Sequence, residues 1–403
     1  MDTRELSLYI HIPFCVRKCN YCDFLSFSCD RNTAADRERM EDYVEDLCTE
    51  IMEFAGRFGS QYHVISVFIG GGTPSLLSGG QIHRIMDCVR TGFALTVDCE
   101  VTMECNPGTV DRVALAEFHA AGVNRLSIGL QTTDDGELKA LGRIHTYEEF
   151  LATYDAALRV GFREVNVDLI SAIPGQTLAS YKRTLQNVLR LKPSHISSYS
   201  LILEEGTPLY ERRRLGEDLH LPDEDTERAM YELTQSLLSE HGYHRYEISN
   251  YAREGSECRH NKVYWKRGEY VGFGLGASSL LRLSQFEPVE GFRDCRLKND
   301  SGPSDYHRLC HRWTMKAEGF EETEHLDAAS CMEEFMFLGL RLREGISRSE
   351  FRQLFGRQLE HVYGPVLEKY IASGHLISDG DRLYLSDRGI DVSNVIFSDF
   401  LLD

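Results

Sequence analysis

The chain has 403 residues, of which 42% are hydrophobic and 27% charged, as is typical of a folded protein with two or three domains. This composition excludes an intrinsically disordered chain and a disulfide-stapled mini-protein. Its 44 Lys and Arg against 63 Asp and Glu give a formal net charge of −19, which argues against a general nucleic-acid binder, because binding to the phosphate backbone relies on positive charge.

The first half of the chain predicts a parallel α/β fold. Short apolar runs alternate with amphipathic helical patterns, beginning with a strand over 8–12 and a helix over 36–58. Such repetition is typical of a parallel sheet with crossover helices. Periodicity alone leaves open whether the sheet is doubly wound or a barrel. The other predicted strands span 64–69, 99–103, 125–130, 165–170 and 196–201, and the other helices lie near 81–91, 111–121, 148–160 and 178–191.

The chain beyond residue 201 is less regular, with a helix near 224–241 and then an aromatic-rich segment. Helical patterns resume from about residue 331, and a hairpin is predicted around Asp379-Gly380, so this end resembles a winged-helix module. Because carboxylates outnumber Lys and Arg there, we interpret it as a lid or docking unit rather than a DNA-binding one. The predicted domains span 1–205, 206–325 and 326–403.

Three of the twelve cysteines lie in one short loop after the first predicted strand: Cys15, Cys19 and Cys22. The N-terminus lacks the regions of a secretory signal, which predicts a cytoplasmic, reducing location where thiols serve metals or catalysis more often than disulfides. A structural zinc would need a fourth ligand, for which Cys29 or His11 is available. Three thiolates can instead hold an iron–sulfur cubane with one open iron, at the strand end where parallel barrels place active sites.

Glycine or polar residues also follow the next predicted strands. Ile69-Gly-Gly-Gly-Thr-Pro74 follows the second strand, and its backbone can approach a ligand closely and offer amide donors, although such a triplet is as often a simple turn. Glu104 follows the third strand, Gln131 the fourth and Asp168 the fifth. Arg143 lies a short way beyond the fourth. We expect these side chains to contact a ligand at a barrel mouth.

The C-x3-C-x2-C motif, with an aromatic residue before its third cysteine, resembles that of the radical S-adenosylmethionine (SAM) superfamily. The resemblance implies a partial (β/α)6 TIM-like barrel whose three cysteines hold a [4Fe–4S] cluster. It also implies that SAM occupies the open iron and that one electron cleaves its sulfonium to a 5′-deoxyadenosyl radical. Arg143 would bind the SAM carboxylate, and Glu104, Gln131 and Asp168 the ribose and adjoining atoms. The implied SAM contacts are Tyr9, Tyr21, Gly71, Gly72, Thr73, Glu104, Gln131, Arg143 and Asp168.

Within this superfamily, three segments together resemble the HemN/HemW family, which is linked to tetrapyrroles. They are Leu8-Tyr-Ile-His-Ile-Pro-Phe-Cys15, the Gly-Gly-Gly-Thr-Pro loop and Leu126-Ser-Ile-Gly-Leu-Gln131. HemN members are oxygen-independent coproporphyrinogen III oxidases. HemW members are haem-binding chaperones thought to deliver haem to respiratory enzymes, and related class C methyltransferases methylate carbon.

Three features favour the HemW group. Phe24 stands where the HemN signature has a further cysteine, and only 14 residues precede Cys15, where HemN has a longer N-terminal arm. The segment Cys258-Arg-His-Asn-Lys-Val-Tyr-Trp265 matches the H-N-x-x-Y-W motif associated with HemW. The resemblance implies that His260 is a haem ligand, and Cys258 is the alternative ligand. Without the resemblance, the favoured interpretation of His260 is a packed, hydrogen-bonded histidine. One departure is Ser278-Ser279, where many relatives have histidine.

The function implied by the resemblance is to bind haem and transfer it to acceptor proteins of the respiratory chain, without classical turnover. The alternative is a radical SAM enzyme, either an oxidoreductase acting on a porphyrinogen or a methyltransferase. Transfer at the membrane surface is compatible with this function, although the acidic sequence gives no sign of an anchor. The sequence does not predict the oligomeric state. Cys48 and Cys88, on predicted helices, are expected to be small core residues.

Overall fold

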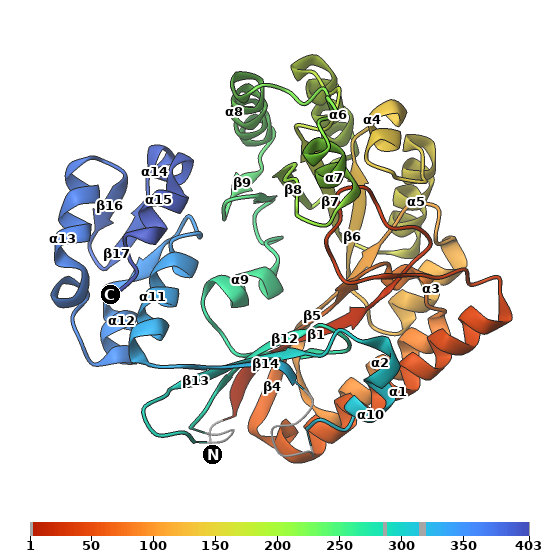
Figure 1. Cartoon of the computed structure of the whole chain (residues 1–403), viewed down its shortest axis with the longest axis horizontal. Helices are drawn as coiled ribbons and strands as arrows, with labels where there is room; N and C mark the ends of the chain where they lie inside the picture. Colours follow the sequence, from red (N-terminus) through yellow and green to blue (C-terminus); the bar gives the residue numbers. More distant parts are fainter. Residues whose placement is uncertain (1–2, 285–287, 314–319, 403) are drawn as a thin grey trace.

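A sheet of 12 strands runs through the computed structural model, which describes residues 3–284, 288–313 and 320–402. Its strand order is β14-β13-β12-β11-β1-β4-β5-β6-β7-β8-β10-β9. The six strands predicted from the sequence lie side by side in chain order and are all parallel, which confirms the parallel α/β fold (Figure 1). They are β1 (Arg4–Ile12), β4 (Tyr62–Gly71), β5 (Ala94–Cys105), β6 (Arg125–Gln131), β7 (Glu164–Ser171) and β8 (His195–Ser200).

The six parallel strands form a partial barrel, because β1 continues to β11 on one side and β8 to β10 on the other. Crossover helices cover its outer face, and neighbouring helices pack against one another in chain order. The sequence sets their limits locally: Thr146 and Glu149 form a capping box at the start of α5, and Gly161, with φ 117°, ends it. The helices are α1 (Ala34–Phe58), α2 (Gly79–Gly92), α3 (Arg112–Ala120), α4 (Asp135–Ala140), α5 (Tyr147–Val160), α6 (Leu178–Leu191) and α8 (Glu224–Glu240).

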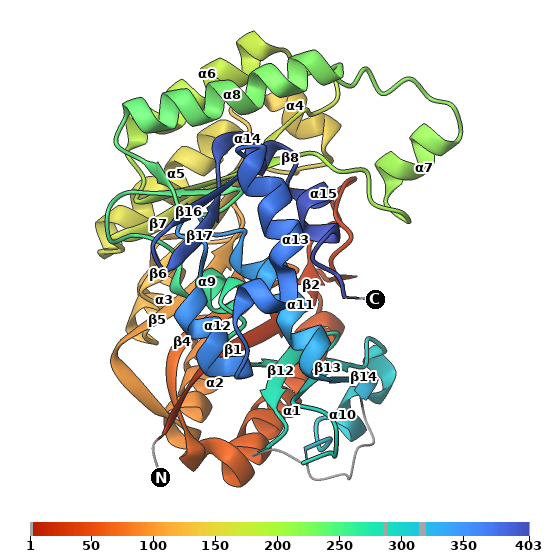
Figure 2. The same cartoon turned by 90° about the vertical axis from the view of Figure 1, so that its left-hand side faces the viewer.

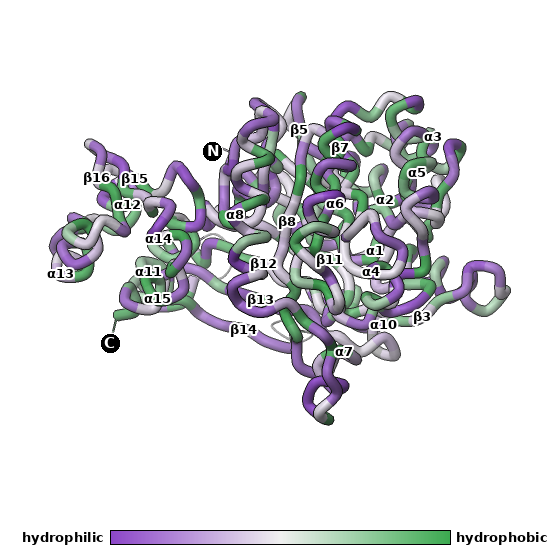
Figure 3. Tube along the Cα trace, turned by 90° about the horizontal axis from the view of Figure 1, so that it is seen from above, coloured by the Kyte–Doolittle hydropathy of each residue, from purple (hydrophilic) through white to green (hydrophobic). Residues whose placement is uncertain are grey.

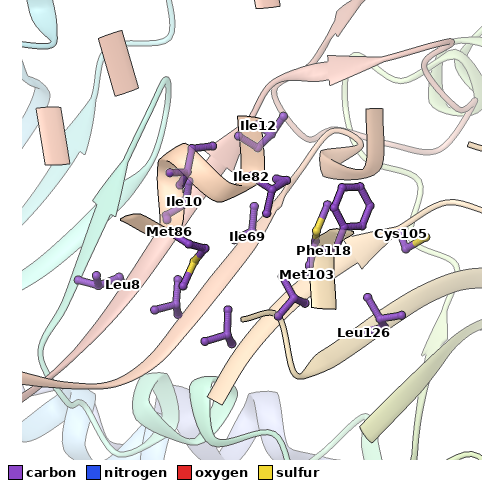
Figure 4. Close-up of a cluster of buried hydrophobic side chains, with 14 of the residues drawn as sticks. Leu8, Ile10, Ile12, Ile69, Ile82, Met86, Met103, Cys105, Phe118 and Leu126 are labelled. Carbon is purple, nitrogen blue, oxygen red and sulfur yellow. The ribbon is translucent and has the colours of Figure 1, made fainter. Parts of the chain in front are cut away.

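The main core lies between the parallel strands and these helices (Figure 4). Ile69 of β4, Met103 of β5 and Leu126 of β6 are fully buried, as are Ile82 and Met86 of α2. A parallel sheet with packed faces needs such near-continuous apolar runs. This packing holds the carboxyl ends of the strands together at one rim of the partial barrel.

The sheet extends beyond the predicted strands at both edges. At one edge, β11 (Tyr270–Phe273) pairs parallel with β1, and β12 (Ser278–Arg282), β13 (Asp294–Asn299) and β14 (Phe320–Leu326) follow antiparallel. At the other edge lie β10 (Asn250–Ala252) and β9 (His244–Arg245). The helix α9 (Arg259–Trp265) lies between the two edges. The smaller elements are β2 (Phe14–Cys15), β3 (Phe27–Ser28), α10 (Tyr306–Leu309) and α7 (Pro208–Arg214), a hydrophilic helix that projects from the body (Figure 3).

The C-terminal module has its own apolar core and lies across the open side of the partial barrel (Figure 2). The backbone N–H of Arg343 donates to Tyr246 O at 2.9 Å, and Arg228 of α8 pairs with Asp391 of the module at 2.9 Å. No helix in the described ranges is long and apolar enough to span a bilayer. The module contains α11 (Ala328–Gly339), β15 (Ile346–Ser347), α12 (Arg348–Phe355), α13 (Leu359–Ala372), the hairpin β16 (Leu376–Asp379) and β17 (Arg382–Leu385), α14 (Asp387–Asp391) and α15 (Ser393–Ser398).

Candidate functional site

The cysteine loop begins directly after β1, at the carboxyl rim of the partial barrel. The N–H of Phe27 donates to Pro13 O at 2.7 Å and that of Cys29 to Cys15 O at 2.8 Å, so the two ends of the loop are closed by backbone bonds. Cys15, Cys19 and Cys22 are free and partly exposed. Burial raises the pKa of Cys22 to about 11, so a bound cation is needed to stabilise its thiolate.

The neighbourhood of the loop does not supply the fourth ligand that a structural zinc would need. Both ring nitrogens of His11 are engaged, Nδ1 with the Tyr9 hydroxyl at 3.0 Å and Nε2 with Leu25 O at 2.9 Å. Cys29 is buried and lies beside Arg39. Within the described ranges, no three His, Cys, Asp or Glu side chains converge closely enough to hold a single metal ion. Three thiolates on one short loop can each bind a different iron of a cubane and leave the fourth iron open.

The Gly71–Thr73 loop packs directly against the cysteine loop. The N–H of Gly72 donates to Ile12 O at 2.9 Å, and the N–H of Gly71 to the Glu104 carboxylate at 2.9 Å. A Cβ atom on Gly72 would lie 2.7 Å from the carbonyl oxygen of Phe14. Glycine is therefore needed at this position because two backbone segments approach each other closely. The amides of Gly71 and Gly72, which we expected to bind a ligand, donate to protein atoms instead.

A chain of hydrogen bonds joins the glycine loop to the cysteine loop. Thr73 Oγ1 donates to Cys15 Sγ at 3.5 Å and accepts from Asn106 Nδ2 at 2.8 Å. Arg143 donates to Asn106 Oδ1 at 2.7 Å, to Gly129 O at 2.8 Å and to Cys19 Sγ at 3.6 Å. Its buried Nε has no partner among the described residues. A guanidinium fixed in this way, with one N–H unused, fits the carboxylate of an amino-acid ligand beside the cysteines.

Two carboxyl groups, Glu104 and Asp168, lie partly buried near this rim. Burial, with a smaller contribution from Asp168, raises the pKa of Glu104 to about 8. Burial also raises the pKa of Asp168, although Ser127 and Asn166 each donate to its carboxylate at 2.8 Å. Such poorly compensated acceptors fit a ligand that brings hydroxyl groups or positive charge, as ribose and a sulfonium do.

The remaining predicted SAM contacts surround the same rim. The Tyr9 ring stacks on Phe68 at a centroid distance of 6.3 Å. Gln131 ends β6 with a left-handed φ of 73° and is buried. Tyr21 packs against a small apolar cluster that includes Leu141 and Ile170. Their roles as ligand contacts stay predictions.

His260 lies deeper in the partial barrel and is only 1% exposed. Its Nδ1 is hydrogen-bonded to the Ser66 hydroxyl at 2.9 Å, and its Nε2 to the Tyr264 hydroxyl at 2.9 Å. Its ring packs on Phe68, which in turn packs on Tyr9, so α9 lies beneath the candidate SAM site. Burial lowers the pKa of His260 to about 3, which keeps the ring neutral. Haem ligation by His260 therefore requires that one of these hydrogen bonds breaks and the ring becomes accessible.

The other residues of the H-N-x-x-Y-W segment are also packed. Cys258 is buried beside Glu100, and burial together with that carboxylate raises its pKa to about 12, which disfavours a thiolate ligand. The guanidinium of Arg341 lies over the Trp265 ring at 4.5 Å, and the buried Nε1 of Trp265 has no partner among the described residues. A cavity of about 430 Å³ lies along α9 and is lined by both cationic and acidic side chains: Arg259, Lys262, Lys266, Glu5, Glu257 and Glu269.

The cysteine loop at the rim of a parallel partial barrel defines a radical SAM protein. The Radical SAM superfamily model matches residues 9–188, and a HemN C-terminal domain model matches residues 326–392. Heme chaperone HemW of Bacillus subtilis (strain 168) is 33% identical over 399 residues, which cover 98% of this chain and 99% of that protein. Heme chaperone HemW of Escherichia coli (strain K12) is 35% identical over 398 residues, 99% of this chain and 98% of that protein. The chain therefore belongs to the HemW family.

The solved structure of coproporphyrinogen III oxidase (HemN) from Escherichia coli, a radical SAM enzyme, has the same overall fold. The two superimpose with a TM-score of 0.81 over 99% of this chain and 90% of that one, at 23% sequence identity. This likeness covers the barrel, the extension and the C-terminal module, and it supports the fold alone.

The sequence did not single out Asn106, Ser127 or Asn166 as site residues. Asn106 links Thr73 to Arg143. Ser127 and Asn166 hold Asp168, and Asn166 also donates to Ser127 at 2.8 Å. Their position on adjacent parallel strands, facing the barrel interior, is the signal that could have identified them.

Proposed function

We propose that the chain binds a [4Fe–4S] cluster through Cys15, Cys19 and Cys22, binds SAM beside it, and carries haem as cargo to acceptor proteins. The observation that carries this proposal is the similarity over nearly the full length, at 33% and 35% identity, to two proteins named heme chaperone HemW. The chain also has the H-N-x-x-Y-W segment on α9. The family resemblance implies that the acceptors are haem proteins of the respiratory chain. We propose that this chain is cytoplasmic and transfers haem to them at the membrane surface.

When bound, the cluster supplies one electron and SAM supplies a sulfonium that an electron can cleave. The protein's own part is to position and shield these groups. Arg143, held by Asn106 and Gly129 O, presents its unused Nε to the carboxylate of SAM. Glu104 and Asp168 accept hydrogen bonds from the ribose and adjoining polar atoms. Thr73 fixes the glycine loop against Cys15 and so limits access of water to that side.

For haem, we propose that α9 opens and that the neutral His260 ring becomes the iron ligand. A neutral imidazole is the form that binds iron, and burial already keeps it neutral. Opening would break the bond from His260 to Ser66 of β4, and the haem iron would replace the Tyr264 hydroxyl on Nε2. Three cations on or directly after this helix, which now pair with Asp98, Glu257 and Glu344, could exchange to haem propionates. They are Arg259, Lys262 and Lys266.

Anoxic haem titration of the chain with its cluster tests the proposal. We expect about one haem per chain, released to a haem-free b-type cytochrome added afterwards. Tyr264→Phe keeps the ring but frees His260 Nε2, so it should tighten haem binding about fivefold, the equivalent of one hydrogen bond of about 1 kcal/mol. His260→Ala should weaken binding and shift the Soret band.

Two results would overturn the proposal. The first is a chain that retains no haem, or retains it without passing it on. The second is stoichiometric formation of protoporphyrinogen when the reduced protein is incubated with SAM and coproporphyrinogen III, which would make it an enzyme. If Tyr264→Phe and His260→Ala both leave haem affinity unchanged, another residue binds the iron.

A further inference from the structure

A pair of cysteines outside the candidate cofactor site lies between two neighbouring helices. Cys48 is on α1 and Cys88 on α2, and these helices pack side by side on the outside of the partial barrel (Figure 1). The two thiols lie close enough for each to shift the pKa of the other. Both pack against the main core, as expected of small core residues, but both are also partly exposed. The seven remaining cysteines outside the Cys15–Cys22 loop are all buried, so this pair is unusually accessible.

Both thiols line an open cavity of about 790 Å³ on the protein surface. Three carboxylates, Glu45, Glu53 and Asp87, line it against one arginine, Arg84. No third His, Cys, Asp or Glu side chain in the described part of the chain joins the pair at metal-binding spacing. The open cavity therefore favours a small thiol-reactive molecule as its ligand, and the acidic lining favours a cationic one.

We propose that Cys48 and Cys88 form a reversible intramolecular disulfide by exchange with a small cationic disulfide, of which cystamine is the probe. The Cys88 thiolate attacks one sulfur of cystamine, which gives a mixed disulfide and releases one cysteamine. Cys48 then loses its proton to solvent and attacks the Cys88 sulfur, which forms the Cys48–Cys88 bond and releases the second cysteamine. The two protein thiols are oxidised by two electrons, and cystamine is reduced to two cysteamines.

The order of attack follows from the surroundings of the two sulfurs. The interaction with Cys48 lowers the pKa of Cys88 to about 7, whereas the same interaction, together with burial, raises the pKa of Cys48. Arg84 lies one helical turn before Cys88 on α2 and favours its thiolate. The new bond would join α1, which follows the cysteine loop, to α2, which follows the glycine loop.

The test treats the full chain, with its cluster, anoxically with cystamine, then alkylates free thiols and maps tryptic peptides by mass spectrometry. The expected product links residues 40–57 to residues 85–90, each of which contains one cysteine, and dithiothreitol separates them. In Cys48→Ser, cysteamine should stay attached to Cys88. In Cys88→Ser, Cys48 should react more slowly, because burial still raises its pKa. Cys99→Ser, a change at a buried cysteine, should leave the link intact.

Two outcomes would overturn the proposal. In the first, the link between peptides 40–57 and 85–90 does not form although other cysteines carry cysteamine. In the second, cysteamine attaches to Cys48 in the Cys88→Ser variant as fast as it attaches to Cys88 in the Cys48→Ser variant. The charge preference has its own check. Cystamine should react several-fold faster than dianionic oxidised glutathione at low salt, and high salt should reduce this ratio. A ratio that does not change with salt would refute the role of the acidic lining.

Discussion

Arg267 connects the segment after α9 to the C-terminal module through buried charges. Its guanidinium donates to Asp294 at 2.5 Å and to Glu334 of α11 at 2.7 Å, and the three side chains are only 4%, 1% and 7% exposed. Arg267→Met would leave both carboxylates buried with less compensation, a change that typically costs about 3–5 kcal/mol. Arg282 and Arg296, which are more exposed, also contact these carboxylates, so we expect the low end, about 3 kcal/mol.

Urea unfolding of the full chain, followed by circular dichroism, measures this loss. With a denaturant slope of about 3 kcal/mol per molar, the midpoint should fall by about 1 M. The matched control is Lys266→Met, the adjacent residue, whose exposed pair with Glu344 should contribute less than about 1 kcal/mol. An Arg267→Met midpoint no lower than that of Lys266→Met would refute the reasoning that buried charge connects the module to α9.

Three further predictions concern the candidate site. Gly72→Ala should lower the iron content well below that of the unmodified chain, because the added Cβ would meet backbone atoms of Phe14. The control Gly56→Ala, which has open space around it, should keep its iron, and equal iron contents in the two variants would contradict the prediction. Burial raises the pKa of Glu104 to about 8, so the folded state keeps a proton that the unfolded state releases near pH 4.5. The free energy of unfolding should therefore fall as pH rises from about 4.5 to 8, by at most about 1.4 kcal/mol per pH unit, and Glu104→Gln should flatten this slope in urea titrations. Burial lowers the pKa of His260 to about 3, so stability should fall as pH drops from about 6.5 to 3, and His260→Gln should be less sensitive to acid in thermal melts. If the Gln variants show the same pH dependence as the unmodified chain, the titrating groups lie elsewhere.

The parallel strands could be predicted because burial on both faces gives them a continuous local signal. In β6, all seven residues from Arg125 to Gln131 are buried, and Leu126, Ile128 and Leu130 alternate along it. The sheet extension gives no such signal. β14 reads Phe-Glu-Glu-Thr-Glu-His-Leu and is mostly exposed at the sheet edge, and β11 contains Gly272. These strands depend on pairing with distant segments rather than on their own pattern.

The candidate site, too, could be predicted from the sequence only in part. The three cysteines lie within eight residues, so their spacing alone indicates a metal-binding loop, and the resemblance to the radical SAM motif favours an iron–sulfur cluster over zinc. The contacts that surround them join residues far apart in the chain, as Asn106 joins Thr73 to Arg143. His260 is the sharpest case, because Ser66, which engages its Nδ1, lies 194 residues earlier. Its motif could be recognised from the sequence, but its burial and its hydrogen bonds could not.

Most directly, the proposed cubane on Cys15, Cys19 and Cys22, with an open iron for SAM, is tested by its composition and its spectrum. Iron and acid-labile sulfide are measured in anoxically purified protein, and electron paramagnetic resonance spectra of the reduced sample are recorded before and after SAM is added. We expect about four irons and four sulfides per chain, a spectrum that changes when SAM is added, and loss of the iron in Cys15→Ser. About one zinc per chain without sulfide, or a spectrum that SAM leaves unchanged, would contradict it.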